Sequence, residues 1–369
     1  MIEPVPILSF FSGGGFLDIG FERAGFNVIW ANENNQRFVE LYKYGYKKWR
    51  IATRRGTDLP FIDNRSIEEL TPRMITYRCF PDGKPRTFGV VGGPPCPDFS
   101  SAGLHAGKDG ANGRLVQGFV DLICDLNPTF FVLENVAGLV RFKRHRKHFD
   151  DLVEHFTLNG YATVHRVLNA LEFGVPQHRE RVFLIGFKRS RLNGHLDNAS
   201  ISSSGWFGWP TIVAYKNAAT RYSWPTSTDF GKTPRKPREV PARLCVGTYL
   251  IPKSMQSRVP NASAFFNPYS RRFLEVAEGD TSQKSFKRLH RYRYSPTACY
   301  GNNEVHLHPW EPRRLSLREA MRIQGIPDSY ELPEDVPLQS GFKLISNAVP
   351  VPLSMHVAKA VSRTLRSLG

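Results

Sequence analysis

Short apolar runs alternate with amphipathic stretches over the first half of the chain. The runs with the length and composition of strands are Val5–Phe11, Phe26–Asn32, Phe88–Val91, Phe130–Leu133, Ala162–Leu168 and Val182–Phe187. Between several of them, as in residues 115–123 and 149–156, apolar side chains recur at helical spacing. This alternation predicts an α/β fold with a mostly parallel sheet and helices on both faces. In such folds, ligands bind at the carboxyl ends of the strands.

The pattern changes after about residue 188. From residue 189 to 295, Ser, Pro, Trp and basic residues replace any regular period. Helical spacing returns at Leu315–Ile323 and again at Leu353–Leu365, where we expect a final helix that packs back on the sheet. The chain therefore divides into residues 1–188 and 296–369, which form one domain, and a smaller loop-rich module of residues 189–295 between them.

Composition excludes several classes of protein. A chain of 369 residues with 41% hydrophobic residues is neither a disordered nor a collagen-like polymer. No apolar run reaches the roughly 18 residues of a membrane span, and the N-terminus lacks the pattern of an export signal. The five cysteines never form a C-x-x-C pair, so neither a disulfide framework nor a metal site is indicated. We expect a soluble, cytoplasmic protein without a metal.

A large basic excess indicates a polyanionic partner. The 50 Lys and Arg outnumber the 33 Asp and Glu, which gives a net charge of +17. Residues 188–310 hold 19 of these cations and 7 of the acids, a net charge of +12. Basic clusters at residues 232–238 and 287–294, the second interleaved with tyrosines, suit a nucleic-acid phosphate backbone. A merely solvated basic face is the alternative.

A glycine-rich turn follows the first predicted strand. The segment FFSGGGF at residues 10–16 lets the backbone turn tightly and approach a ligand closely. Glu33 follows the second strand, where it can accept hydrogen bonds from two ribose hydroxyls. These features indicate an adenosine-containing cofactor. The full G-x-G-x-x-G pattern is absent, which favours a cofactor without a pyrophosphate, although the turn alone does not separate a nicotinamide from S-adenosylmethionine.

Cys96 lies in the segment GGPPCPDFS, directly after the predicted strand Phe88–Val91. Two prolines can neither continue a helix nor join a central strand, so the chain leaves the sheet in a stiff loop. A loop of this kind presents a cysteine as a nucleophile. A small side chain buried at a strand end is an equally good interpretation of this segment alone.

Glu134 follows the predicted strand Phe130–Leu133, beside the strand that precedes Cys96. Its carboxyl group could bond the ring nitrogen and the exocyclic amine of a nucleobase. The alternative is that Glu134 caps the next helix.

The segment QHRER at residues 177–181 precedes the last predicted strand. Alternate residues of an extended chain share a face, so Gln177, Arg179 and Arg181 are expected to line one face together. Two arginines there suit an electron-rich oxygen or a phosphate. An ion pair with Glu180 or Glu172 is the competing explanation.

Six segments stand in the order found in the DNA (cytosine-5)-methyltransferase family, and the chain resembles the prokaryotic restriction-modification members of that family. The segments are FFSGGG, GGPPCPDFS, ENV, QHRER, RRLSLREAMRIQGIPD and SNAVP. The match covers about residues 5–188 and 296–365. It implies a Rossmann-like fold that depends on S-adenosylmethionine, and it implies that residues 189–295 form a target-recognition domain.

The resemblance also implies a mechanism. Cytosine in a duplex is inaccessible, so the enzyme flips the base out, and Cys96 attacks its C6 to make C5 nucleophilic. The resulting C5 takes the methyl group of S-adenosylmethionine. Glu134 is then expected to hold or protonate N3, while Arg181 supports O2 and Arg179 orders the site.

The family pattern assigns a set of residues to the cofactor. They are Phe11, Gly13, Gly15, Glu33, Asp63, Asn64, Pro95, Leu115 and Asn347. Residues 100–114, which contain four glycines, are expected to form a loop that closes over DNA. Four positions depart from the family pattern without removing a catalytic group, namely Phe16, Asn34, Pro97 and Ser346.

Three other functions are less consistent with the sequence. A tRNA cytosine-5 methyltransferase of the same fold would share the catalytic residues, but its CFT signature is absent. An inactive DNA-binding module would be expected to lose Cys96 or Glu134, and a nicotinamide oxidoreductase leaves PPC and QHRER unexplained. The expected partners are double-stranded DNA and a cognate restriction endonuclease. We expect the protein to bind DNA as a monomer, in the nucleoid of a prokaryote. No membrane partner is expected.

Overall fold

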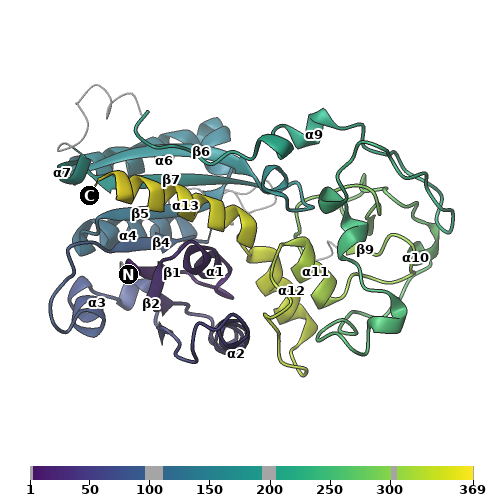
Figure 1. Ribbon diagram of the computed structural model, residues 1–369, viewed down its shortest axis with the longest axis horizontal. Helices are drawn as coiled ribbons and strands as arrows, with labels where there is room; N and C mark the ends of the chain where they lie inside the picture. Colours follow the sequence, from purple (N-terminus) through teal and green to yellow (C-terminus); the bar gives the residue numbers. More distant parts are fainter. Residues whose placement is uncertain (1–2, 96–110, 193–204, 301–305, 369) are drawn as a thin grey trace.

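A seven-stranded sheet carries the main part of the molecule, as Figure 1 shows. The computed structural model describes residues 3–95, 111–192, 205–300 and 306–368. The strands are β1 (Pro6–Phe10), β2 (Asn27–Asn32), β3 (Phe61–Asp63), β4 (Gly89–Gly92), β5 (Phe130–Val136), β6 (Tyr161–Asn169) and β7 (Glu180–Lys188), in the order β3-β2-β1-β4-β5-β7-β6. Of these, β7 runs antiparallel to both its neighbours, and the other pairs are parallel. The predicted α/β fold with a mostly parallel sheet is confirmed.

Two features of the sheet differ from the sequence prediction. The edge strand β3 was not predicted, since three residues are too few to show a period. Strand β5 continues to Val136, three residues beyond the predicted end, so that Glu134 lies within the strand instead of after it.

Helices cover both faces of the sheet. On one face, α1 and α13 contribute Phe21 and Val357 to a core that includes Phe130 of β5. On the other face, α4 and α6 contribute Phe119 and Phe156 to a second core. Helix α13, in yellow in Figure 1, is the predicted final helix, and it packs back on the sheet as expected. The helices of this part are α1 (Phe16–Arg23), α2 (Gln36–Ala52), α3 (Pro72–Cys79), α4 (Ala111–Leu126), α5 (Gly138–Arg141), α6 (Lys143–Leu158), α7 (Arg189–Leu192), α11 (Leu317–Ile323), α12 (Leu338–Asn347) and α13 (Val351–Ser367).

Helix α2 carries an aromatic face that the sequence prediction missed. Tyr42, Tyr46 and Trp49 recur at helical spacing and are fully or almost fully buried. They pack in a third core with residues of α1, α11 and α12. Close packing is possible at Gly45, where a Cβ atom would lie 2.3 Å from the ring of Tyr330. This core joins the N-terminal and C-terminal parts of the chain.

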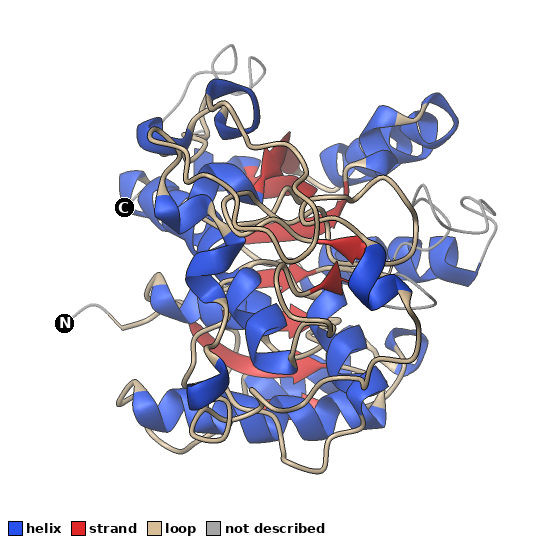
Figure 2. Ribbon diagram, turned by 90° about the vertical axis from the view of Figure 1, so that its right-hand side faces the viewer, coloured by secondary structure: helices blue, strands red, loops and turns tan. Residues whose placement is uncertain are grey.

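The loop-rich module has little regular structure in the part that the structure describes. Between residues 205 and 295 lie the four-residue helices α9 (Ala218–Arg221) and α10 (Arg272–Glu275) and the two-residue strand β8 (Lys287–Arg288), which pairs with β9 (His306–Leu307) of the following segment. In Figure 1 this module forms a second lobe beside the sheet, and Figure 2 shows its loops in front of the strands. The predicted loss of periodicity is confirmed.

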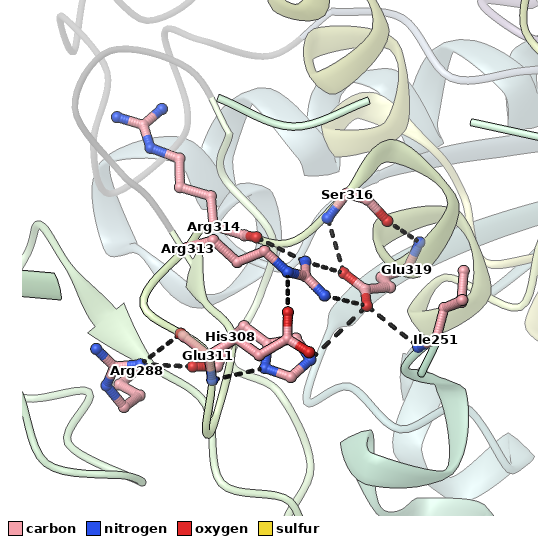
Figure 3. Close-up of polar contacts among 8 residues, drawn as sticks. All are labelled: Ile251, Arg288, His308, Glu311, Arg313, Arg314, Ser316 and Glu319. Carbon is pink, nitrogen blue, oxygen red and sulfur yellow. Dashed lines mark hydrogen bonds and ion pairs between the residues drawn. The ribbon is translucent and has the colours of Figure 1, made fainter. Parts of the chain in front are cut away.

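A buried carboxylate of α11, Glu319, attaches this lobe to the helix through Ile251 and is itself held by Arg313 (Figure 3). Arg313 donates to both oxygens of Glu319, at 2.7 and 2.9 Å, and Glu319 also accepts the backbone N–H of Ile251 at 3.1 Å. Ser316 and Glu319 form a reciprocal capping box at the start of α11. His308 lies beside this pair, where burial and the neighbouring arginines lower its pKa and keep it neutral. One carboxylate thus joins three segments of the chain.

Gly186 of β7 packs closely against Phe131 of the neighbouring strand β5, and a substitution there tests this contact. A Cβ atom at Gly186 would lie 2.1 Å from the ring of Phe131, so we expect Gly186→Ala to destabilise the protein by about 1–3 kcal/mol. The matched control is Gly118→Ala in α4, where no atom lies within 4 Å of the added Cβ and helix propensity predicts a gain of about 0.5–1 kcal/mol. Denaturant unfolding measures both, and an unchanged stability for Gly186→Ala would contradict the packing described.

Candidate active site

Strands β1, β2 and β4 end in register at one edge of the sheet, level with Leu133 of β5. Phe10 of β1 pairs with Asn32 of β2 and Gly92 of β4, and Gly92 pairs with Leu133 of β5. The next residue along each strand is therefore in the same row. This row consists of Phe11, Glu33, Gly93 and Glu134. The segments singled out from the sequence thus meet at the carboxyl ends of parallel strands, where ligands of α/β proteins bind.

The glycine-rich turn is held against Glu33. Gly13 and Asn35 donate their backbone N–H groups to the two carboxylate oxygens of Glu33, each at 2.9 Å. Each oxygen therefore keeps a lone pair for another donor. Burial raises the pKa of Glu33, and these two hydrogen bonds oppose that rise. The position predicted for Glu33, directly after the second strand, is confirmed.

The turn itself needs its glycines for different reasons. Gly13 has a φ of 55° and Gly15 a φ of 76°, both in the left-handed region. At Gly15 a Cβ atom would also lie 2.7 Å from the ring of Tyr42, whereas nothing lies within 4 Å of the corresponding position at Gly13. Open space beside a carboxylate with free lone pairs fits a ribose with two hydroxyls.

The end of β3 offers one engaged and one exposed polar side chain. Asp63 accepts hydrogen bonds from the side chain of Arg65 at 2.9 and 2.5 Å, which lowers the pKa of Asp63. Asn64 is exposed and donates to Gln36 at 3.1 Å. The sequence analysis missed Asn32, whose amide donates to the backbone oxygens of Asp63 and Arg65 and joins the ends of β2 and β3. A polar residue at the end of an apolar strand was the available signal.

The remaining residues assigned to the cofactor lie in varied surroundings. Phe11 contacts Phe119 edge-on, with ring centroids 5.5 Å apart, and Leu115 is half-buried against the same core. Pro95 is half-buried, and Asn347 is exposed at the end of α12.

Cys96, which the sequence predicts to be the nucleophile, lies outside the described residues. The expected closing loop up to residue 110 is not part of the described structure either. The loop was expected to extend to residue 114, but α4 begins at Ala111, so that limit is wrong. Gly103, Gly107 and Gly110 therefore lie outside the described residues, while Gly113 belongs to the helix.

Glu134 and Arg181 form a buried ion pair across β5 and β7. Arg181 Nε lies 2.9 Å from a carboxylate oxygen of Glu134, and about a tenth of each side chain is exposed. The antiparallel register pairs Arg181 with Val136, which puts Arg181 diagonally opposite Glu134 on the same face. Burial raises the pKa of Glu134, and the charges of Arg181 and Arg179 oppose the rise. The helix-cap alternative is wrong, because Ala137 is the residue at the N-cap of α5.

The chain that leads to Cys96 lies against this carboxyl group. A Cβ atom at Gly93 would be 2.7 Å from Glu134 Oε2, so no larger residue fits there. Asn135 donates from its amide to the backbone oxygen of Pro94 at 3.4 Å. Sequence analysis did not assign a role to Gly93 or Asn135, although the doublet of glycines before two prolines was a visible signal.

Arg179 joins distant segments instead of lining a strand face. Its guanidinium is almost fully buried and donates to the backbone oxygens of Ala298 at 3.3 Å and Ser346 at 2.7 Å. Burial lowers its pKa. Strand β7 begins at Glu180, so Gln177 and Arg179 precede the strand. The charge of Arg179 still acts on Arg181 and Glu134, in keeping with the expectation that the two arginines lie near each other.

The competing ion-pair explanation for these arginines is also wrong. Glu180 pairs with Arg141, and Glu172 accepts the backbone N–H of Asn217.

The two basic clusters of the loop-rich lobe differ. Arg235, Lys236 and Arg238 are exposed. In the second cluster, the phosphate-contact prediction is wrong for Arg288 and Arg291. Arg288 is fully buried and donates to backbone oxygens, including that of His308 at 2.6 Å, while Arg291 pairs with the buried Glu278 at 2.7 Å. Cations used in this way hold the lobe together.

The described ranges contain neither a candidate metal-binding cluster nor a candidate membrane-spanning helix. Residues 3–95, 111–192, 205–300 and 306–368 contain no group of three or more His, Cys, Asp and Glu side chains arranged to hold a metal ion. Within the same ranges, no helix is long and apolar enough to cross a bilayer.

Comparison with known proteins identifies the family. The model of the C-5 cytosine-specific DNA methylases matches residues 5–363. The type II methyltransferase M.NmeDI of Neisseria meningitidis serogroup C is 42% identical over 98% of this chain and 83% of its own length. M.FnuDI of Fusobacterium nucleatum, also a type II methyltransferase, is 30% identical over 97% of this chain and 94% of its own length.

Among solved structures, the fold is similar to that of a protein encoded within an E. coli prophage. The TM-score is 0.63, with 24% identity over 98% of this chain and 99% of the other. S. pombe Dnmt2 methyltransferase gives a TM-score of 0.60 at 14% identity, with 99% of both chains covered. The fold, the row of strand-end residues and the match over almost the whole chain agree: this protein belongs to the C-5 cytosine-specific DNA methylases, the enzymes that methylate C5 of cytosine in DNA.

Proposed function

We propose that the enzyme transfers a methyl group from S-adenosylmethionine to C5 of a flipped-out cytosine in a specific double-stranded DNA sequence, through a covalent bond between Cys96 and C6. The observation that carries this proposal is the buried Glu134–Arg181 pair, which lies against Gly93, three residues before Cys96. A carboxyl group with a raised pKa at that place can exchange a proton with a nucleobase.

The proposed cofactor fits the strand-end row. Glu33 keeps free lone pairs beside the open space at Gly13, as two ribose hydroxyls require. Phe11 and Leu115 offer apolar surface from the core side, Asp63 and Asn64 lie at the adenine in this proposal, and Asn347 lies at the methionine end. Pro95 is a further proposed contact of the cofactor. S-adenosylmethionine would supply a methyl group bonded to a positively charged sulfur.

In the proposed reaction, side chains of the enzyme first add to the cytosine and are then released from it. The Cys96 thiolate forms a bond to C6, the ring electrons move toward N3, and Glu134 gives N3 its proton. With S-adenosylmethionine bound, C5 would take its methyl group, and the sulfur would keep the electrons of the bond that breaks. Glu134 takes back the N3 proton, and a base from the solvent takes the C5 proton. The electrons of the C5–H bond then restore the C5–C6 double bond and expel the Cys96 thiolate. Arg181 supports O2 with donors that Glu134 and Glu180 leave free.

Residues 189–295 are proposed to read the DNA site as a target-recognition domain. Exposed cations at Arg235, Lys236 and Arg238 suit the phosphate backbone. The relatives M.NmeDI and M.FnuDI are type II methyltransferases, which supports a role beside a cognate restriction endonuclease. We further propose that the enzyme binds its DNA site as a monomer.

Transfer of tritium from labelled S-adenosylmethionine tests this function directly. Duplex DNA of mixed sequence and tRNA are the two substrates, and Cys96→Ala is the control. Label on C5 of DNA cytosines that the control lacks supports the proposal. Label on tRNA alone would move the mechanism to RNA, and no label on either would refute catalysis.

Glu134→Gln removes the proton that the mechanism requires but keeps the shape of the side chain. We expect the single-turnover methylation rate to fall by about 10²–10⁴-fold. The reaction needs Glu134 in its protonated form, and the fraction in that form falls as pH rises, so the ratio of the wild-type rate to the variant rate should decline with rising pH.

The matched control for that prediction is Glu180→Gln, which breaks the contact with Arg141 at the rim of the sheet. Its rate should stay within about twofold of the wild-type rate, because an exposed pair contributes little. A rate for Glu134→Gln equal to that of the control would argue against proton transfer by Glu134.

The exposed basic cluster predicts a change in salt dependence. Replacing Arg235, Lys236 and Arg238 together by serine should lower the slope of log affinity against log salt by about 0.9 for each lost phosphate contact. The comparison variant replaces Arg23, Lys359 and Arg366, which are exposed on α1 and α13. Fluorescence anisotropy with duplex DNA measures the slope for both triple variants. If the two slopes are equal, the cluster of Arg235, Lys236 and Arg238 does not contact DNA phosphates.

A further inference from the structure

A buried hydrogen-bond chain runs beneath the glycine-rich turn. Ser12, inside the turn, donates from Oγ to Ser9 Oγ at 3.0 Å, and its Oγ also lies 3.3 Å from the backbone oxygen of Ser9. Ser9 Oγ donates to Asp18 Oδ1 at 2.6 Å. From the other side, the hydroxyl of Tyr42 donates to Asp18 Oδ2 at 2.9 Å. One carboxylate thus connects the turn, β1, α1 and α2.

This carboxylate is costly to bury and lacks a cationic partner in an ion pair among the described residues. Asp18 and Ser9 are completely inaccessible to solvent. The nearest charge that acts on Asp18 is that of Glu22, which has the same sign. Hydroxyl donors and the start of α1, where a negative charge is favourable, offset the cost only in part. A buried charge of this kind calls for a role beyond packing.

The turn above it is strained. Phe11 has a φ of 52°, a left-handed value that is unfavourable for a bulky residue, and Gly13 has a φ of 55°. Ser12 lies between them, and its backbone N–H donates to Asn32 at 2.9 Å. The side-chain bond from Ser12 to Ser9 is a second restraint on this segment, and it depends on the orientation that Asp18 gives to Ser9.

We propose that Asp18 is a positioning residue for the cofactor, because through Ser9 and Ser12 it holds the turn in the conformation that places Gly13 N–H against Glu33. The proposal rests on the proposed function, in which S-adenosylmethionine binds at this turn. Asp18 itself does not reach the cofactor, since it is enclosed below β1.

When Asp18 is ionised, its carboxylate can only accept hydrogen bonds, which fixes the donor and the acceptor in each bond of this chain. The hydroxyl hydrogens of Ser9 and Tyr42 then both point to the carboxylate, which leaves Ser9 Oγ free to accept from Ser12. Burial raises the pKa of Asp18 to about 7, Glu22 adds to the rise, and the bonds from Ser9 and Tyr42 oppose it. A proton on the carboxyl group reverses one of these donors and weakens the link to the turn. The other titratable and charged groups around this network are Tyr46, Tyr330, Arg50 and Arg55.

Asp18→Asn tests the proposal by binding alone. The probe is S-adenosylhomocysteine, titrated into the full chain without DNA and followed by calorimetry. At pH 8 we expect the Kd to rise about tenfold, because a charge-assisted link is lost. The difference in Kd between the wild-type protein and Asp18→Asn should become smaller as pH falls through about 7, because the wild-type Asp18 carboxyl then becomes neutral as well. Glu33 titrates in both proteins and cancels in this comparison.

Two further variants separate positioning from general stability. Glu22→Gln alters a buried carboxylate one turn further along α1, which pairs with Arg50 and makes no bond to the turn, so the Kd should stay within about twofold even if the protein is less stable. Ser9→Ala cuts the chain at a residue that cannot touch a ligand, and it should weaken binding as Asp18→Asn does. In the double variant Asp18→Asn/Ser9→Ala, the two effects should not add.

Failure of the positioning role and failure of the proposed function would give different results. Wild-type affinity in a folded Asp18→Asn variant, at every pH, would overturn the positioning role while leaving the proposed function in place. If Asp18→Asn does not fold, Ser9→Ala decides in the same way. Failure of the wild-type protein to bind S-adenosylhomocysteine would overturn the proposed cofactor, and the positioning role with it.

Discussion

The ion pair of Glu134 and Arg181 is the interaction on which the candidate active site depends. The Glu134 carboxylate is 93% buried and has an ionic partner, and removal of one member of such a pair costs about 3–5 kcal/mol. Arg181 reaches Glu134 because β7 runs antiparallel to β5 in a register that puts the two side chains on one face. The reversed strand in an otherwise parallel sheet therefore has a chemical consequence: it brings a cation to the end of a strand.

The same edge shows how the sheet collects polar groups that are far apart in the chain. Strands β1, β2 and β4 end in register beside Leu133 of β5, which puts Phe11, Glu33, Gly93 and Glu134 in one row. Arg179 adds a second level of connection, because its two backbone acceptors belong to segments more than 100 residues away. Glu319, which Arg313 holds in place, connects the loop-rich lobe to α11 by accepting the backbone N–H of Ile251. Buried arginines thus hold together parts of the molecule that lack regular secondary structure.

Much of this arrangement could be predicted from the sequence, and the exceptions have physical reasons. Strand and helix alternation indicated the sheet, and the position of Glu33 followed from a glycine-rich turn and a strand end. The short strand β3 left no periodic signal, whereas the aromatic face of α2 did leave one and was overlooked. The direction in which a side chain points was harder to predict. Arg288 resembles a surface cation in the sequence, yet its acceptors are backbone oxygens brought together only by folding.

The most direct measurement of the central claim is an attempt to trap the proposed covalent bond between Cys96 and C6. Duplex DNA with 5-fluorocytosine in place of cytosine keeps fluorine on C5, so the enzyme cannot be released by loss of a proton. With S-adenosylmethionine present, the account predicts a stable protein–DNA adduct that peptide mass spectrometry locates at Cys96. An adduct at another residue, or methylation of normal DNA without any adduct on the fluorinated duplex, would contradict it.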